Sequence, residues 1–175
     1  MLGIVALCAT SLFVQSSVLT HEDKAVIEAA VDQKERSFHH RIVFVSTTSR
    51  SAEFVKLLKP EDKQLPYVSA LIKRNSRSVF LDDYAPSWAS LTASGEDAVG
   101  WFGNRSWLSQ ESYVDWISLP AYNNDHTVAA IFVSALVRDP SSGNRRLGGK
   151  SMILRLKKTA AGWQPDGSIG RVIAI

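Results

Sequence analysis

The chain of 175 residues has the composition of one globular domain. Apolar residues make up 45% of it and charged residues 21%, which excludes intrinsic disorder and collagen-like or coiled-coil architectures. A chain of this length buries enough surface to fold without disulfides or a structural metal. The net charge of +3 is too small to indicate a nucleic-acid-binding protein.

The N-terminal segment predicts a secretory signal peptide over residues 1–16. It carries no charged side chain, and its apolar run over residues 2–14 is too short to cross a bilayer but fits the central region of a signal. Val14 and Ser16 suit the cleavage positions, which leaves one mature domain over residues 17–175. Because no basic side chain precedes the run, the alternatives are a start further upstream, a weak signal, or a buried helix of the domain.

The single cysteine, Cys8, lies within this segment. Leu7 precedes it, whereas a lipoprotein signal has a small residue there, so we expect no lipid anchor. Cleavage would leave a mature chain without cysteine, which excludes thiol catalysis and cysteine-bound zinc. Export without disulfides indicates a bacterial periplasmic or secreted protein.

The first half of the mature chain is predicted to be mainly helical. Thr20 and the acidic residues after it are typical of a helix N-cap, and Pro66 opens a second helix that ends near Asn75. In chain order we expect a helix over 21–37, a strand over 41–46, a short amphipathic segment over 52–58, a helix over 65–75, a strand over 78–82, a surface loop over 84–95 and a short helix within 96–107.

The second half is predicted to be β. Strands are expected over 113–119, 127–138, 151–158 and 169–175, separated by turns rich in Asn, Asp and Gly. Residues 128–137 are apolar on both alternating faces, so this strand is expected to be central and covered on both sides. Arg155 and Lys157 share one face of the predicted strand 151–158, so we expect this face to meet solvent. The fold class is therefore α+β: a single domain in which a C-terminal antiparallel meander of four or more strands packs against two or three helices.

Two stretches of the sequence carry a resemblance. The residues LP…LIKRN…VFL in the middle of the chain and WISLPAYNNDHTVAAIFVSAL…GGKSMILRLKKTAAGWQ toward its end resemble a group of uncharacterised exported bacterial proteins. The resemblance spans most of the mature chain. It implies an N-terminal helix, a central helix ending in Asn and a meander closing on Gly-Trp. That group has no established activity, so the resemblance implies no catalytic residue.

Several common chemistries do not fit the sequence, and we expect no cofactor or metal. Residues 143–151 lack the first glycine of a phosphate-binding loop and precede a strand, so they predict a hairpin loop. No Gly-x-Ser-x-Gly elbow occurs, and the four histidines show no zinc-ligand spacing. His126 is expected in a solvated turn. The alternative is a hydrolase acting on envelope polymers, with His126 and a carboxylate such as Asp115, Asp125 or Glu111 as its acid–base pair.

Charge divides unevenly along the chain, with a net −5 over residues 76–129 and +6 over residues 130–175. The simpler interpretation is that the two regions are neighbours that neutralise each other. The functional one is an exposed basic loop formed by Arg145, Arg146 and Lys150, which would bind an anionic envelope component or an acidic protein. Interleaved aromatic residues are missing, so nucleic acid is not favoured as a partner.

Five tryptophans are many for a domain of this size. Trp116 and Trp163 lie in predicted strand and turn positions typical of core residues. Trp88 and Trp101 lie among Gly, Ser and Pro residues, so they are candidates for exposed ligand contacts. The sequence therefore predicts a non-catalytic exported binding protein, with no transmembrane span in its mature chain and with its ligand and oligomeric state left open.

Overall fold

The computed structural model describes residues 19–31, 41–81, 84–93, 112–138 and 147–174. Its elements are α1 (His21–Ala30), β1 (Arg41–Val45), α3 (Ser51–Phe54), η1 (Val55–Leu57), η2 (Asp62–Gln64), α4 (Pro66–Arg74), β2 (Leu91–Ala93), β3 (Ser112–Ile117), β4 (Ala121–Tyr122), β5 (Val128–Arg138), β6 (Leu147–Thr159) and β7 (Gly162–Ala174). The predicted signal peptide and the short helix within 96–107 lie outside the described residues.

The strands form one mixed sheet in the order β2-β1-β3-β5-β6-β7, with β4 paired to the beginning of β5. Strands β3, β5, β6 and β7 pair antiparallel in succession, which confirms the predicted C-terminal meander and the α+β class. Strand β1 runs parallel to both β2 and β3. These parallel pairings require long crossover connections, and the sequence analysis did not predict them.

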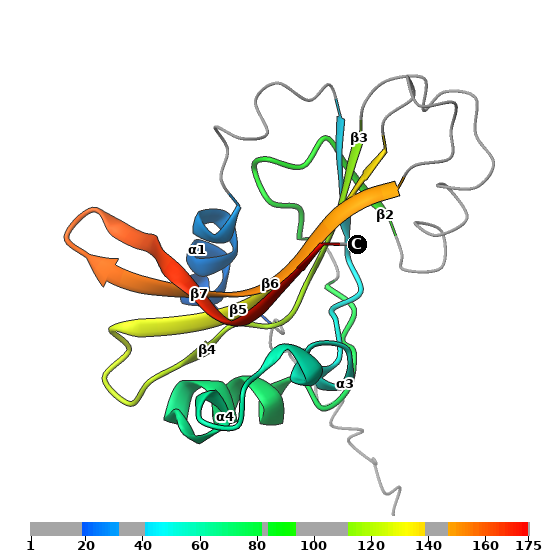
Figure 1. Ribbon diagram of the computed structural model, residues 1–175. Helices are drawn as coiled ribbons and strands as arrows, with labels where there is room; N and C mark the ends of the chain where they lie inside the picture. The colour runs from blue at the N-terminus through cyan, green and yellow to red at the C-terminus, as the bar shows by residue number, and fades with distance from the viewer. Residues whose placement is uncertain (1–18, 32–40, 82–83, 94–111, 139–146, 175) are drawn as a thin grey trace, which may run out of the picture.

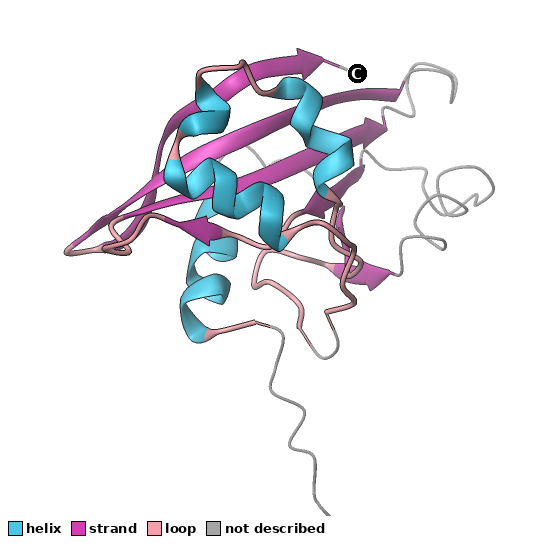
Figure 2. Ribbon diagram, turned by 90° about the horizontal axis from the view of Figure 1, so that it is seen from below, coloured by secondary structure: helices cyan, strands magenta, loops and turns pink. Residues whose placement is uncertain are grey.

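Helices cover both faces of this sheet (Figures 1 and 2). On β5, Ile131 is fully buried on the side of α1, and Phe132 is buried on the side of α3 and α4. The prediction that this strand is central and covered twice is confirmed. The prediction that one face of residues 151–158 meets solvent is wrong along part of the strand. Ile153, on the face of Arg155 and Lys157, packs at zero exposure beneath α3 and α4. Leu156, on the other face, packs toward α1.

Three local predictions differ from the structure. Helix α1 ends at Ala30, because Val31 adopts an extended conformation (φ −103°, ψ 116°). Over its described residues, 78–81, the predicted strand 78–82 is not formed, and Phe80 makes only an isolated bridge to Thr47. The predicted surface loop over 84–95 contains strand β2 and places Trp88 in the core at 9% exposure.

Trp88 is buried because its loop folds back over β1. The backbone N–H of Ser90 donates to the carbonyl of Ile42 at 2.8 Å, and this contact brings the tryptophan onto the α1 side of the sheet. There the Trp88 ring meets Phe44 edge to face, with centroids 5.7 Å apart. Its Pro- and Ser-rich surroundings therefore reflect a loop that packs inward, and Trp88 does not occupy the exposed position predicted for it.

Helix α4 begins at Pro66 and is capped at its C-terminus by Asn75, as predicted. The Asn75 side chain is fully buried and uses both ends of its amide. Its Nδ2 donates to the carbonyls of Leu71 and Leu119, both at 2.9 Å, and its Oδ1 accepts from the N–H of Leu119 at 2.8 Å. The cap therefore ties the end of α4 to the chain that leaves β3.

A buried ion pair joins α1 and α4, which lie on opposite faces of the sheet (Figure 1). Asp23, with 0% side-chain exposure, accepts from Arg74 Nη1 and Nη2 at 2.7 Å and from the Tyr122 hydroxyl at 2.9 Å. Asp23 also completes a capping box with Thr20. Burial raises the pKa of Asp23, but hydrogen bonds from Arg74 and Thr20 outweigh burial, so the pKa falls below its ordinary value.

Candidate functional site

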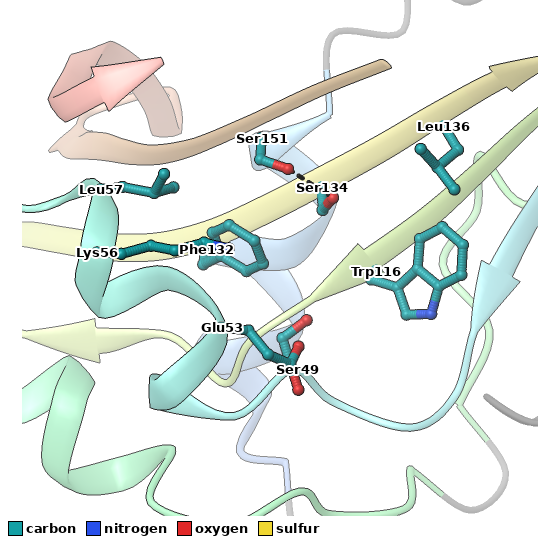
Figure 3. Close-up of a pocket in the computed structure, with 9 residues that line it drawn as sticks. All are labelled: Ser49, Glu53, Lys56, Leu57, Trp116, Phe132, Ser134, Leu136 and Ser151. Carbon is teal, nitrogen blue, oxygen red and sulfur yellow. Dashed lines mark hydrogen bonds between the residues drawn. The ribbon is translucent and has the colours of Figure 1, made fainter. Parts of the chain in front are cut away.

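An open pocket of about 410 Å³ lies between the sheet and the α3–η1 segment (Figure 3). It is on the sheet face that also carries α4, beside the part of the core that α3 and η1 cover. Its lining residues are Ser49, Glu53, Lys56, Leu57, Trp116, Phe132, Ser134, Leu136 and Ser151. They come from three strands of the meander and from the segment that follows β1.

The floor of the pocket is a row of three residues from neighbouring strands. Trp116 on β3 pairs with Ser134 on β5, which pairs with Ser151 on β6. Neighbouring strands lie about 4.8 Å apart, so these residues form one continuous row across the sheet. Phe132 and Leu136 extend the floor along β5, because residues two apart on a strand share a face.

The wall of the pocket is the α3–η1 segment, which is anchored to the sheet at both ends. The Ser49 N–H donates to the carbonyl of Ile117 at 2.7 Å, and the Phe54 ring stacks on Phe132 with centroids 5.1 Å apart. Leu57 is 1% exposed. The wall is therefore held in place by core packing.

Two hydroxyls at the floor face each other across the strands. Ser134 Oγ and Ser151 Oγ are 2.8 Å apart, so one hydroxyl donates to the other and the proton of the second remains available. Ser151 is 9% exposed, and burying a hydroxyl is costly unless it is hydrogen-bonded. Under α3 and α4 the same face carries apolar residues, whereas the hydroxyls occur where the pocket opens. This arrangement suits a floor that contacts a polar group of a ligand.

The wall carries two charged groups in different situations. The Glu53 carboxylate lies 3.5 Å from Arg50 Nε, in an exposed ion pair. The Lys56 ammonium has no hydrogen bond or ion pair with any residue that the structure describes. Among the lining residues that the structure describes, Lys56 is therefore the cation available to an anion in the pocket.

The predicted basic loop coincides only in part with the described chain. Lys150 is exposed and belongs to β6 rather than to a loop. It precedes Ser151, so its side chain projects from the opposite face of the sheet, away from the pocket. Arg145, Arg146 and Trp101 lie outside the described residues, and Trp88 is in the core.

His126 lies in a turn, at the positive φ of 55°. Its Nδ1 is 2.8 Å from Glu22 Oε2, its side chain is 55% exposed, and its ring stacks on Tyr122 with centroids 4.8 Å apart. Asp115 is fully buried in β3, and Glu111 lies outside the described residues. His126 thus contacts a carboxylate that the sequence analysis did not pair with it, and it does not line the pocket.

No sequence pattern indicated this pocket. Trp116 was predicted to be core, but it is half-buried and lines the floor, whereas Trp163 is buried at 8% exposure as predicted. Ser134 and Ser151 were not considered as site residues. The available signal was one polar residue, Ser134, within a strand that is apolar on both faces.

Within the described residues, no group of three or more His, Cys, Asp or Glu side chains is placed to hold a metal ion. The helices of that same part of the chain are too short or too polar to cross a membrane. No protein-family model, curated protein or solved structure matches the chain, so the interpretation of the site depends on its own geometry.

Proposed function

We propose that this protein is a non-catalytic binding protein that holds a small, largely apolar ligand in the pocket between α3–η1 and the sheet. The observation that carries the proposal is the row of Trp116, Ser134 and Ser151 at the floor of an open space of about 410 Å³. Ligand pockets typically measure about 300–1,000 Å³ and combine an apolar lining with a few placed polar groups.

The lining favours binding over turnover. Trp116 and Phe132 supply aromatic surface for an apolar body, and the serine pair supplies one donor and several acceptors that would orient it. Among the described residues that line the pocket there is no histidine, and the carboxylate of Glu53 is paired with Arg50. The proposed hydrolase alternative would need a base beside a nucleophile, and His126 belongs to the exposed contact with Glu22.

Filling the pocket from its floor tests this function. We expect indole, a neutral aromatic probe, to shift the NMR signals of the Trp116 side-chain N–H and of the Ser134 and Ser151 amides. In Ser134→Leu the added side chain occupies the centre of the floor, so the affinity for indole should fall at least about tenfold, equivalent to 1.4 kcal/mol. The measurement is a ¹H–¹⁵N titration of the wild type and the variant.

Ser168→Leu is the matched control, because Ser168 is an exposed strand residue on β7 that does not line the pocket. Its affinity for indole should equal that of the wild type. The proposal fails if indole leaves the pocket signals of the wild type unmoved, or if Ser134→Leu binds it as well as the wild type does.

This binding role is proposed for the bacterial periplasm or exterior, on the basis of the signal-like residues 1–16 and the resemblance to exported proteins. We expect N-terminal sequencing of the protein recovered from fractionated cells to begin at Ser17. Recovery of a chain in the cytoplasm that still begins with Met1 would contradict the proposed location without affecting the pocket.

A further inference from the structure

We infer that the pocket selects ligands in which a carboxylate is attached to an aromatic or branched apolar body, with Lys56 as the group that recognises the carboxylate. The inference rests on the proposed binding function and adds a ligand class to it. It follows from the charges of the pocket wall, the backbone around Lys56 and the hydrogen-bonding capacity of the floor.

The charges around the pocket favour an anionic ligand group. Of the lining residues in the described part of the chain, Glu53 and Lys56 carry ionisable side chains. The carboxylate of Glu53 already has Arg50 beside it, whereas the ammonium of Lys56 has no partner among the residues that the structure describes. An anionic ligand group would therefore form an ion pair with Lys56 without breaking an existing one. An ammonium group on the ligand would instead have to displace Arg50 from Glu53.

The backbone of Lys56 is held in place by core packing on both sides. It lies in η1 between two residues of the buried core, Phe54 at 0% and Leu57 at 1% exposure. The backbone of η1 also contacts β7, where Gly170 lies against the Leu57 carbonyl. The Lys56 side chain is exposed while the backbone that carries it is held by these contacts, so little backbone ordering is required when it binds an anion.

The floor and the wall of the pocket both offer hydrogen-bond donors to a carboxylate. The ammonium of Lys56 has three donors, and the Ser134–Ser151 pair keeps one more. A carboxylate accepts at both oxygens, and charge-assisted hydrogen bonds are the stronger kind. Trp116, Phe132 and Leu136 then face the remaining apolar part of the ligand, for which an aromatic or branched group is the matching shape.

The test compares two probes of nearly the same shape, the anion indole-3-acetate and its neutral amide indole-3-acetamide. Both are titrated at neutral pH and low salt while the Trp116, Ser134 and Ser151 signals are followed. We expect the wild type to bind the carboxylate about fivefold more tightly, the size of effect that an exposed lysine supplies. The preference should shrink as salt is added, because exposed charges are screened.

Lys56→Gln should bind the two probes equally, and Lys59→Gln should keep the wild-type preference. Lys59 is the control because it is exposed and nearby but does not line the pocket. Equal binding of the two probes by the wild type, or a preference that survives in Lys56→Gln, would overturn the inference and leave the proposed function standing. If neither probe shifts the pocket signals, the proposed function fails as well.

Discussion

Replacing Asp23 by Asn is expected to lower the free energy of unfolding by about 3 kcal/mol, the lower end of what breaking a buried ion pair costs. The substitution keeps the size of the side chain but removes its charge, and it turns one acceptor into a donor that faces Arg74. The side chain of Arg74 is 29% exposed, so water replaces part of the lost interaction. The contacts of Asp23 with Thr20 and Tyr122 are disturbed as well.

Urea unfolding of the wild type and Asp23→Asn measures this effect. Asp166→Asn is the matched control, because Asp166 pairs with Arg155 at 3.0 Å while both side chains are almost half exposed. Removing that surface pair should cost less than about 1 kcal/mol. Equal losses in the two variants would show that the Asp23–Arg74 pair contributes no more than a surface contact.

The same pair makes the difference between wild type and Asp23→Asn depend on pH. The pKa of Asp23 is lower in the folded chain than in the unfolded one, so its stabilisation is present at neutral pH and is lost as the pH falls below about 4 and through the folded pKa. The two unfolding free energies should therefore converge in acid. A gap that stays constant between pH 7 and pH 2 would contradict the assignment.

Replacing Gly170 by Ala is expected to cost about 3 kcal/mol, through two effects that add. Gly170 has a φ of +75°, where a side chain costs about 1–2 kcal/mol. An added Cβ would also overlap the Leu57 carbonyl oxygen and lie 3.3 Å from Leu58 Cα. Backbone atoms cannot turn aside as a flexible side chain does, so β7 and η1 must separate, at a further cost of about 1–3 kcal/mol.

Gly167→Ala separates the two effects. Gly167 has a φ of +121° but no atom within 4 Å of an added Cβ, so it carries the conformational cost without the clash. Thermal or urea unfolding should therefore show a smaller loss for Gly167→Ala than for Gly170→Ala. If the losses are equal, the contact between β7 and η1 is not the close approach described.

Local patterns in the sequence were sufficient for the elements whose signals lie within a few residues. Thr20 and Asp23 form the capping box of α1, Pro66 and Asn75 bound α4, and the apolar strand 128–137 is central. These predictions hold because caps, helix starts and alternating strands depend on neighbours along the chain. The end of α1, the parallel strand β1 and the inward position of Trp88 depend on packing, and sequence patterns did not reveal them.

The sequence alone therefore determined the α+β class, the meander and the caps of the helices, whereas only the tertiary structure revealed the pocket. Trp116, Ser134 and Ser151 are each unremarkable within their own strands. They become one surface only through the register of β3, β5 and β6. Register and the placement of α3–η1 are set by contacts between residues far apart in the chain. A local sequence pattern does not tell which residue of a neighbouring strand will lie opposite a given residue.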